Sequence, residues 1–92
     1  MMRRIIRVHF PAIDSELLEN AVAAFYAVRD FGDIEKRPAT RELINWIRAL
    51  KADPDFKPKQ LAKGDLPYLG VLFKKSQDLR KAQAMVSRRR AI

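Results

Sequence analysis

The chain has 92 residues, and 19 Lys and Arg against 11 Asp and Glu give it a formal net charge of +8. Hydrophobic residues make up 48% of it, which is enough for the core of one small domain and argues against general disorder. Cysteine is absent, which excludes disulfides, thiolate metal sites and a cysteine nucleophile. No apolar run is long enough to cross a bilayer. The positive charge favours an anionic partner: nucleic acid, nucleotide phosphate or an acidic protein surface.

Residues 4–10 alternate between two sides of an extended chain, with Ile6, Val8 and Phe10 on one of them. This period of two predicts a strand, which Pro11 ends because proline cannot donate to a strand ladder. No second strand is predicted for it to pair with. We therefore interpret residues 1–12 as the remnant of a sheet that lies outside this sequence.

Two amphipathic helices are predicted next. Asp14 is a suitable N-cap for the first, whose apolar residues recur at helical spacing and whose end is marked by Gly32. The second is predicted to begin near Thr40, with the hydroxyl as its cap. It should end at Asp53 and Pro54, because the residue before a proline avoids helical geometry.

The remaining third of the chain predicts shorter elements and one further helix. A helical turn is expected at 59–62, closed by Gly64, and a short buried turn within the apolar stretch 66–73. Ser76 is predicted to cap a final helix, whose inner stripe is Leu79, Ala82, Met85 and Val86. The expected fold is therefore all-α, a small bundle of about four helices with a short N-terminal strand.

Catalytic signatures are missing from the sequence. It contains no phosphate-binding loop of the form GxxxxGK[ST], and three glycines are too few for a loop that wraps phosphates with backbone amides. A single histidine, His9, and no cysteine predict no metal site. No Ser-His-Asp arrangement can be argued either. We expect no enzymatic activity and no bound cofactor for this chain alone.

The charge that stands out is Arg41, in the first turn of the helix predicted from residue 40. A cation there opposes the positive end of the helix dipole. Its position is better explained if the guanidinium faces an anion.

Three segments carry a resemblance to the MoxR family of AAA+ ATPases. The run RRIIRVHFP at 3–11 resembles the end of the last strand of the family's ATPase core. The run PATRELINW at 38–46 resembles the lid helix that carries the sensor-2 arginine, and LPYLGVLFKKSQDL at 66–79 resembles a segment near the C-terminus of one branch. The three segments occur in the family's order, and the resemblance extends over essentially the whole chain between and around them.

The resemblance implies a division into a core strand remnant at 1–12 and a helical lid domain at 13–92. Arg41 matches the sensor-2 arginine, which reaches the γ-phosphate of ATP, and Thr40 takes that position if the match shifts by one residue. Arg3 and Arg4 match a paired arginine that can approach the nucleotide of a neighbouring subunit.

The resemblance also implies a larger protein around the lid. ATP and Mg²⁺ would be bound by the AAA+ core, and the full-length protein would be a cytoplasmic homohexamer with chaperone-like remodelling activity. A von Willebrand A-domain protein would be its possible partner, with neither a membrane nor a nucleic acid involved.

Two alternatives stay open at this stage. A freestanding basic helical domain could bind nucleic acid through its cations, with 88–90 as an arginine cluster and Trp46 and Tyr68 available for stacking. Four phosphate contacts would then give a salt slope of roughly −3.6 in log K against log salt. The other alternative is a protein-interaction adaptor that exposes the apolar stretch 66–73.

Overall fold

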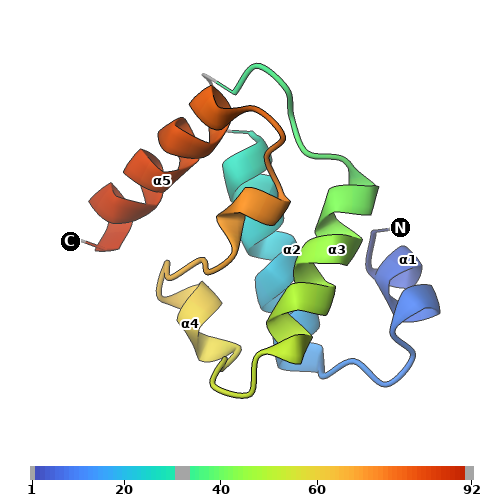
Figure 1. Cartoon of the computed structure of the whole chain (residues 1–92). Helices are drawn as coiled ribbons and strands as arrows, with labels where there is room; N and C mark the ends of the chain where they lie inside the picture. Colours follow the sequence, from blue (N-terminus) through green and yellow to red (C-terminus); the bar gives the residue numbers. More distant parts are fainter. Residues whose placement is uncertain (1, 31–33, 91–92) are drawn as a thin grey trace.

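Helices form all the regular structure in the part of the chain that the computed structural model describes, residues 2–30 and 34–90, with the side chains of 87–90 excepted. The predicted all-α class is confirmed, as a bundle of helices around one core (Figure 1). In chain order the elements are α1 Met2–His9, α2 Ser15–Arg29, α3 Thr40–Ala52, α4 Lys59–Ala62, the 3₁₀ helix η1 Leu69–Val71 and α5 Ser76–Arg90.

The predicted N-terminal strand is wrong, since Met2–His9 is the helix α1. Met2, Ile5 and Ile6 are spaced as neighbours on a helix face, so this short run fits a helical period as well as a period of two. Ile6 is fully buried in the core, whereas Val8 is 73% exposed. Because α1 packs against α2 and α3, residues 2–9 do not provide the unpaired strand on which the inference of a sheet outside the sequence rests.

Helix α2 begins as the sequence predicts. Asp14 is its N-cap, and the Asp14 Oδ2 accepts a hydrogen bond of 3.1 Å from the Leu17 backbone N–H. This satisfies one of the backbone donors that a helix start leaves free. The apolar face of α2 supplies much of the core, including Leu18, Phe25 and Val28. Gly32, expected just past its end, lies outside the described residues.

Helix α3 begins one residue away from the predicted cap. Ala39 is the N-cap, and Thr40 is the first helical residue, so the expected hydroxyl cap at Thr40 is wrong. The carboxylate of Glu42 closes the turn instead, because its Oε2 accepts a 3.0 Å hydrogen bond from the Ala39 N–H. Helix α3 ends at the C-cap Asp53, as predicted from the following proline.

The predicted turn at 59–62 is confirmed as α4, and Gly64 follows it with a positive φ of 87°. The buried turn within 66–73 is also confirmed, as η1, and most of the large apolar side chains of this stretch are buried in the core. Tyr68 has an unusual φ of 62°, and its Oη donates a 2.8 Å hydrogen bond to Asp53 Oδ2. The core residues of this stretch are Leu66, Leu69, Leu72 and Phe73.

Helix α5 packs through the predicted stripe, with Ala82 and Val86 buried and Leu79 and Met85 half-buried. Ser76 is the first residue of α5, so the prediction that it caps the helix from outside is wrong. Asp78, in the first turn, is fully buried. Its carboxylate accepts hydrogen bonds from the segment that leads into α3.

Candidate functional site

One side of α3 carries a row of exposed polar side chains. Arg41, Asn45, Arg48 and Lys51 follow one another at intervals of three or four residues, which places them on one helix face. The opposite face is buried and includes Leu43, Trp46, Ile47 and Leu50. The buried face therefore determines which side of α3 the polar row occupies.

The N-terminal half of this row borders an open hollow of about 330 Å³, which we call the Arg41 groove. It lies between α3 and the end of α1, and none of its lining residues is acidic. The lining residues are His9, Thr40, Arg41, Ile44, Asn45 and Arg48. A groove with arginines and no carboxylate offers a favourable environment for an anion.

Arg41 is exposed, and it makes no hydrogen bond or ion pair with any residue of the described part of the chain. Its neighbour Glu42 does not neutralise it, because that carboxylate is only 8% exposed and its Oε1 lies 3.3 Å from Lys74 Nζ. Burial alone would raise the pKa of Glu42. Hydrogen bonds from backbone N–H groups, including that of Ala39, and the Lys74 ammonium outweigh burial and lower that pKa.

Two other cations of the row are already engaged. The Arg48 Cζ lies 5.9 Å and the Lys51 Nζ 5.1 Å from the centroid of the Phe10 ring, so both make cation–π contacts. Arg48 Nη1 also donates a 3.3 Å hydrogen bond to Asn45 Oδ1. These contacts connect Phe10, just after α1, to α3. Among the described residues, Arg41 is the arginine of the groove with no hydrogen bond, ion pair or ring contact.

The structure brings together some of the residues singled out in the sequence and separates others. Arg41 and Thr40 line the same groove. Arg3 and Arg4 are exposed on α1 and do not line it. Arg3 is instead paired with Glu19 of α2 through two hydrogen bonds of 2.6 and 2.8 Å, and this pairing lowers the pKa of the Glu19 carboxyl.

Sequence reasoning missed His9 and Arg48 as groove residues. Arg48 follows Arg41 by two helical turns, so the spacing was visible in the sequence. The sequence did not indicate His9 as a neighbour of Arg41, because residues 4–10 were predicted to be a strand of a separate sheet.

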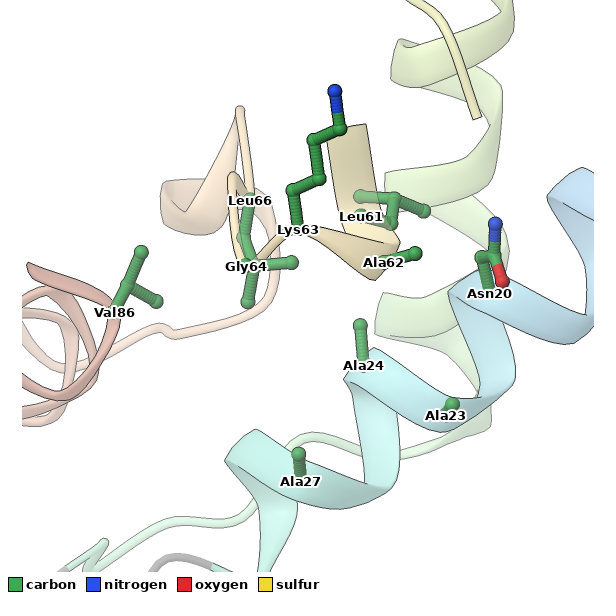
Figure 2. A pocket seen from close by; sticks show the side chains of 10 residues that line it. All are labelled: Asn20, Ala23, Ala24, Ala27, Leu61, Ala62, Lys63, Gly64, Leu66 and Val86. Atoms are coloured by element: carbon green, nitrogen blue, oxygen red, sulfur yellow. The ribbon is translucent and has the colours of Figure 1, made fainter. Parts of the chain in front are cut away.

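A second hollow, of about 340 Å³, lies between α2, α4 and α5. Figure 2 shows the small side chains of Ala23, Ala24 and Ala27 along α2, with Val86 of α5 across the gap. The ammonium of Lys63 extends away from these alanines. Among the side chains that the structure describes, none that lines this hollow directs a charge into it, so the Arg41 groove is the stronger candidate.

The described side chains also bear on the two alternatives. Trp46 is fully buried and its Nε1 donates a 2.7 Å hydrogen bond to the Pro67 carbonyl, so the expectation that it is available for base stacking is wrong. Tyr68 is 46% exposed. The arginine cluster at 88–90, which belongs to the nucleic-acid alternative, has its side chains outside the described ones. The adaptor hypothesis is weakened because most of the large apolar side chains of 66–73 lie in the core.

Within the described ranges, no three His, Cys, Asp or Glu side chains gather as a metal site would require. The described helices include none with the length and apolar character needed to cross a membrane. Comparisons with protein-family models, with curated proteins and with solved structures returned no match to this chain.

Proposed function

We propose that this chain is the helical lid domain of a MoxR-type AAA+ ATPase and that Arg41 contacts the phosphates of ATP bound by a separate core. The observation that carries the proposal is the state of Arg41: exposed, unpaired among the described residues, and projecting from the first turn of a helix whose other face is buried. The resemblance at 38–46 supports the same residue independently of the geometry.

The proposed role follows from the chemistry of the guanidinium group. Arginine keeps its charge at all physiological pH values and presents five N–H donors in a fixed plane, which suits phosphate oxygens. Placed against the terminal phosphate, it would stabilise the charge that develops during phosphoryl transfer. Thr40 borders the same groove and supplies a hydroxyl that can bind a neighbouring oxygen.

The rest of the ATP site belongs to the core in this proposal. The sequence has no phosphate-binding loop, and the described residues hold no acidic cluster for Mg²⁺. ATP and Mg²⁺ are thus ligands of the full-length protein, and the lid contributes one cation and a hydroxyl. Hexamer formation, chaperone-like remodelling, a von Willebrand A-domain partner and a cytoplasmic location complete the proposal, all from the family resemblance.

Titration of the ¹⁵N-labelled chain with tripolyphosphate, followed by NMR, tests the groove. Without a core, binding should be weak, with a dissociation constant on the order of 1 mM or above. Chemical-shift changes should centre on Thr40, Arg41 and Asn45 and should disappear in Arg41→Ala. Arg37→Ala is the matched control, because Arg37 is an exposed arginine that does not line the groove. An equal loss of the chemical-shift changes in both variants would refute a specific anion site at Arg41.

A freestanding nucleic-acid-binding domain remains the second candidate, favoured by the cationic row Arg41, Arg48 and Lys51 on one face of α3. Two of these three cations lie near the Phe10 ring, a contact that orients the side chains but leaves their charge in place. Duplex DNA provides the decisive comparison. Tight binding with a steep loss of affinity in salt would favour nucleic acid over the lid, whereas a lid should bind duplex DNA no better than it binds tripolyphosphate.

A further inference from the structure

The first turn of α5 holds the segment that leads into α3. Asp78 is fully buried, and its two carboxylate oxygens accept 2.9 Å hydrogen bonds from the backbone N–H groups of Glu35 and Lys36. The partners are more than 40 residues apart in the sequence. In Figure 1 the start of α5 lies beside the loop that runs into α3.

Two ion pairs, both made by lysines that directly precede α5, reinforce this junction. The Lys75 Nζ lies 2.8 Å from Glu35 Oε1, and the Lys74 Nζ lies 3.3 Å from Glu42 Oε1. The second pair reaches into α3 itself, because Glu42 also closes the first turn by accepting from the Ala39 N–H. Residues just before and within the start of α5 therefore contact the chain on both sides of the α3 N-cap.

We propose that Asp78 is a positioning residue for the Arg41 groove: its buried carboxylate fixes the path of the chain into α3 and so fixes where Arg41 projects. This inference rests on the function proposed above, because it assigns Asp78 a role at the same anion site. Asp78 itself does not line the groove, so it acts only through the segment that it holds.

The chemistry of the contact explains why a carboxylate is needed. Two backbone N–H donors converge on one buried side chain, and a carboxylate has an acceptor oxygen for each. An asparagine of the same shape has one acceptor oxygen, and its NH₂ group would face an N–H donor. Asp78→Asn should therefore break one of the two hydrogen bonds to the backbone of Glu35 and Lys36 without removing volume from the core.

The test compares Asp78→Asn with Leu61→Val, using the whole chain and tripolyphosphate as the probe. Leu61 is buried on α4, which lies at the other end of the molecule from the start of α5 in Figure 1. Leu61→Val should lower the melting temperature without moving the groove. In Asp78→Asn, we expect the amide signals of Thr40, Arg41 and Glu42 to shift, and tripolyphosphate binding to weaken by roughly threefold or more.

The outcomes separate the two proposals. If Asp78→Asn lowers the melting temperature but leaves both the amide signals of residues 40–42 and the tripolyphosphate affinity as they are in Leu61→Val, Asp78 is merely structural and the inference is overturned. If the unmodified chain binds no tripolyphosphate, the anion site fails. The amide signals of residues 40–42 and faster amide exchange at Glu35 and Lys36 then still decide whether Asp78 positions α3.

Discussion

Two carboxylates determine how α3 begins. Glu42 and Asp78 are both buried, and both accept hydrogen bonds from backbone N–H groups. Glu42 is three residues from its partner, which is the spacing of one half of a capping box, but Ala39 has no side-chain acceptor to complete that pattern, so the sequence alone did not indicate the contact. Asp78 bonds across more than 40 residues, and no local pattern in the sequence could have predicted that pairing.

These carboxylates should make stability depend on pH. Burial opposes ionisation of Glu42, but hydrogen bonds and Lys74 lower its folded pKa below its usual 4.5. Hydrogen bonds from Glu35 and Lys36 lower the pKa of Asp78 below its usual 3.8. Because both folded pKa values lie below the unfolded ones, their stabilisation is complete above about pH 5 and is lost as pH falls through the folded values.

We therefore expect a melting temperature that is constant near neutral pH and falls on acidification below about pH 5. Thermal melts of the chain and of Glu42→Gln and Asp78→Asn across this range check the prediction. Each variant should be less stable at neutral pH and should lose less stability on acidification. A variant with the same acid slope as the unmodified chain would show that its carboxylate is not responsible.

Trp46 provides a second prediction for a single residue. Trp46→Phe keeps an aromatic ring in the core but leaves the Pro67 carbonyl without the Nε1 donor. The loss should cost about 1–3 kcal/mol, measured by denaturant unfolding followed by circular dichroism. Because Trp46 is the one tryptophan of the chain, its buried-type fluorescence in the unmodified protein provides an independent check. An emission typical of water-exposed indole would contradict the described packing.

At the scale of elements, the sequence predicted the long helices but not α1, which was expected to be a strand. Long amphipathic segments such as α2 and α3 were predicted because many apolar positions repeat at helical spacing. The eight residues of α1 are too few to distinguish the two periods, and packing decides between them. The cap residues at Thr40 and Ser76 were misplaced because a polar residue at a helix start suits the cap and the first helical position alike.

A matched pair of substitutions tests the α1 helix. Ile6 is fully buried and Val8 is 73% exposed, although a strand would place both on one side. Ile6→Ala should cost about 2–5 kcal/mol of the free energy of unfolding. Val8→Ala should change it by no more than about 0.5 kcal/mol. Similar large losses at both positions would favour the strand.

At the scale of the whole molecule, the candidate site was only partly predictable. Arg41 and Thr40 were found in the sequence because they lie in one recognisable helix start. The groove around them depends on α1, since His9 reaches it from a segment far away in sequence. The burial of Trp46 likewise depends on the segment around η1, because its Nε1 donates a hydrogen bond to the carbonyl of Pro67, just before η1. Such features arise from packing between elements, which local patterns do not encode.

The most direct test of the lid proposal is ATP turnover by the native protein that carries this sequence, purified from its source cells by antibody against this chain. The account predicts a product several-fold heavier than 10.7 kDa that hydrolyses ATP. Arg41→Ala should reduce its turnover by about 10²-fold or more, as loss of a donor to the developing charge does, while Arg37→Ala should not. A native product of 10.7 kDa without ATPase activity, or full turnover in Arg41→Ala, would contradict the account.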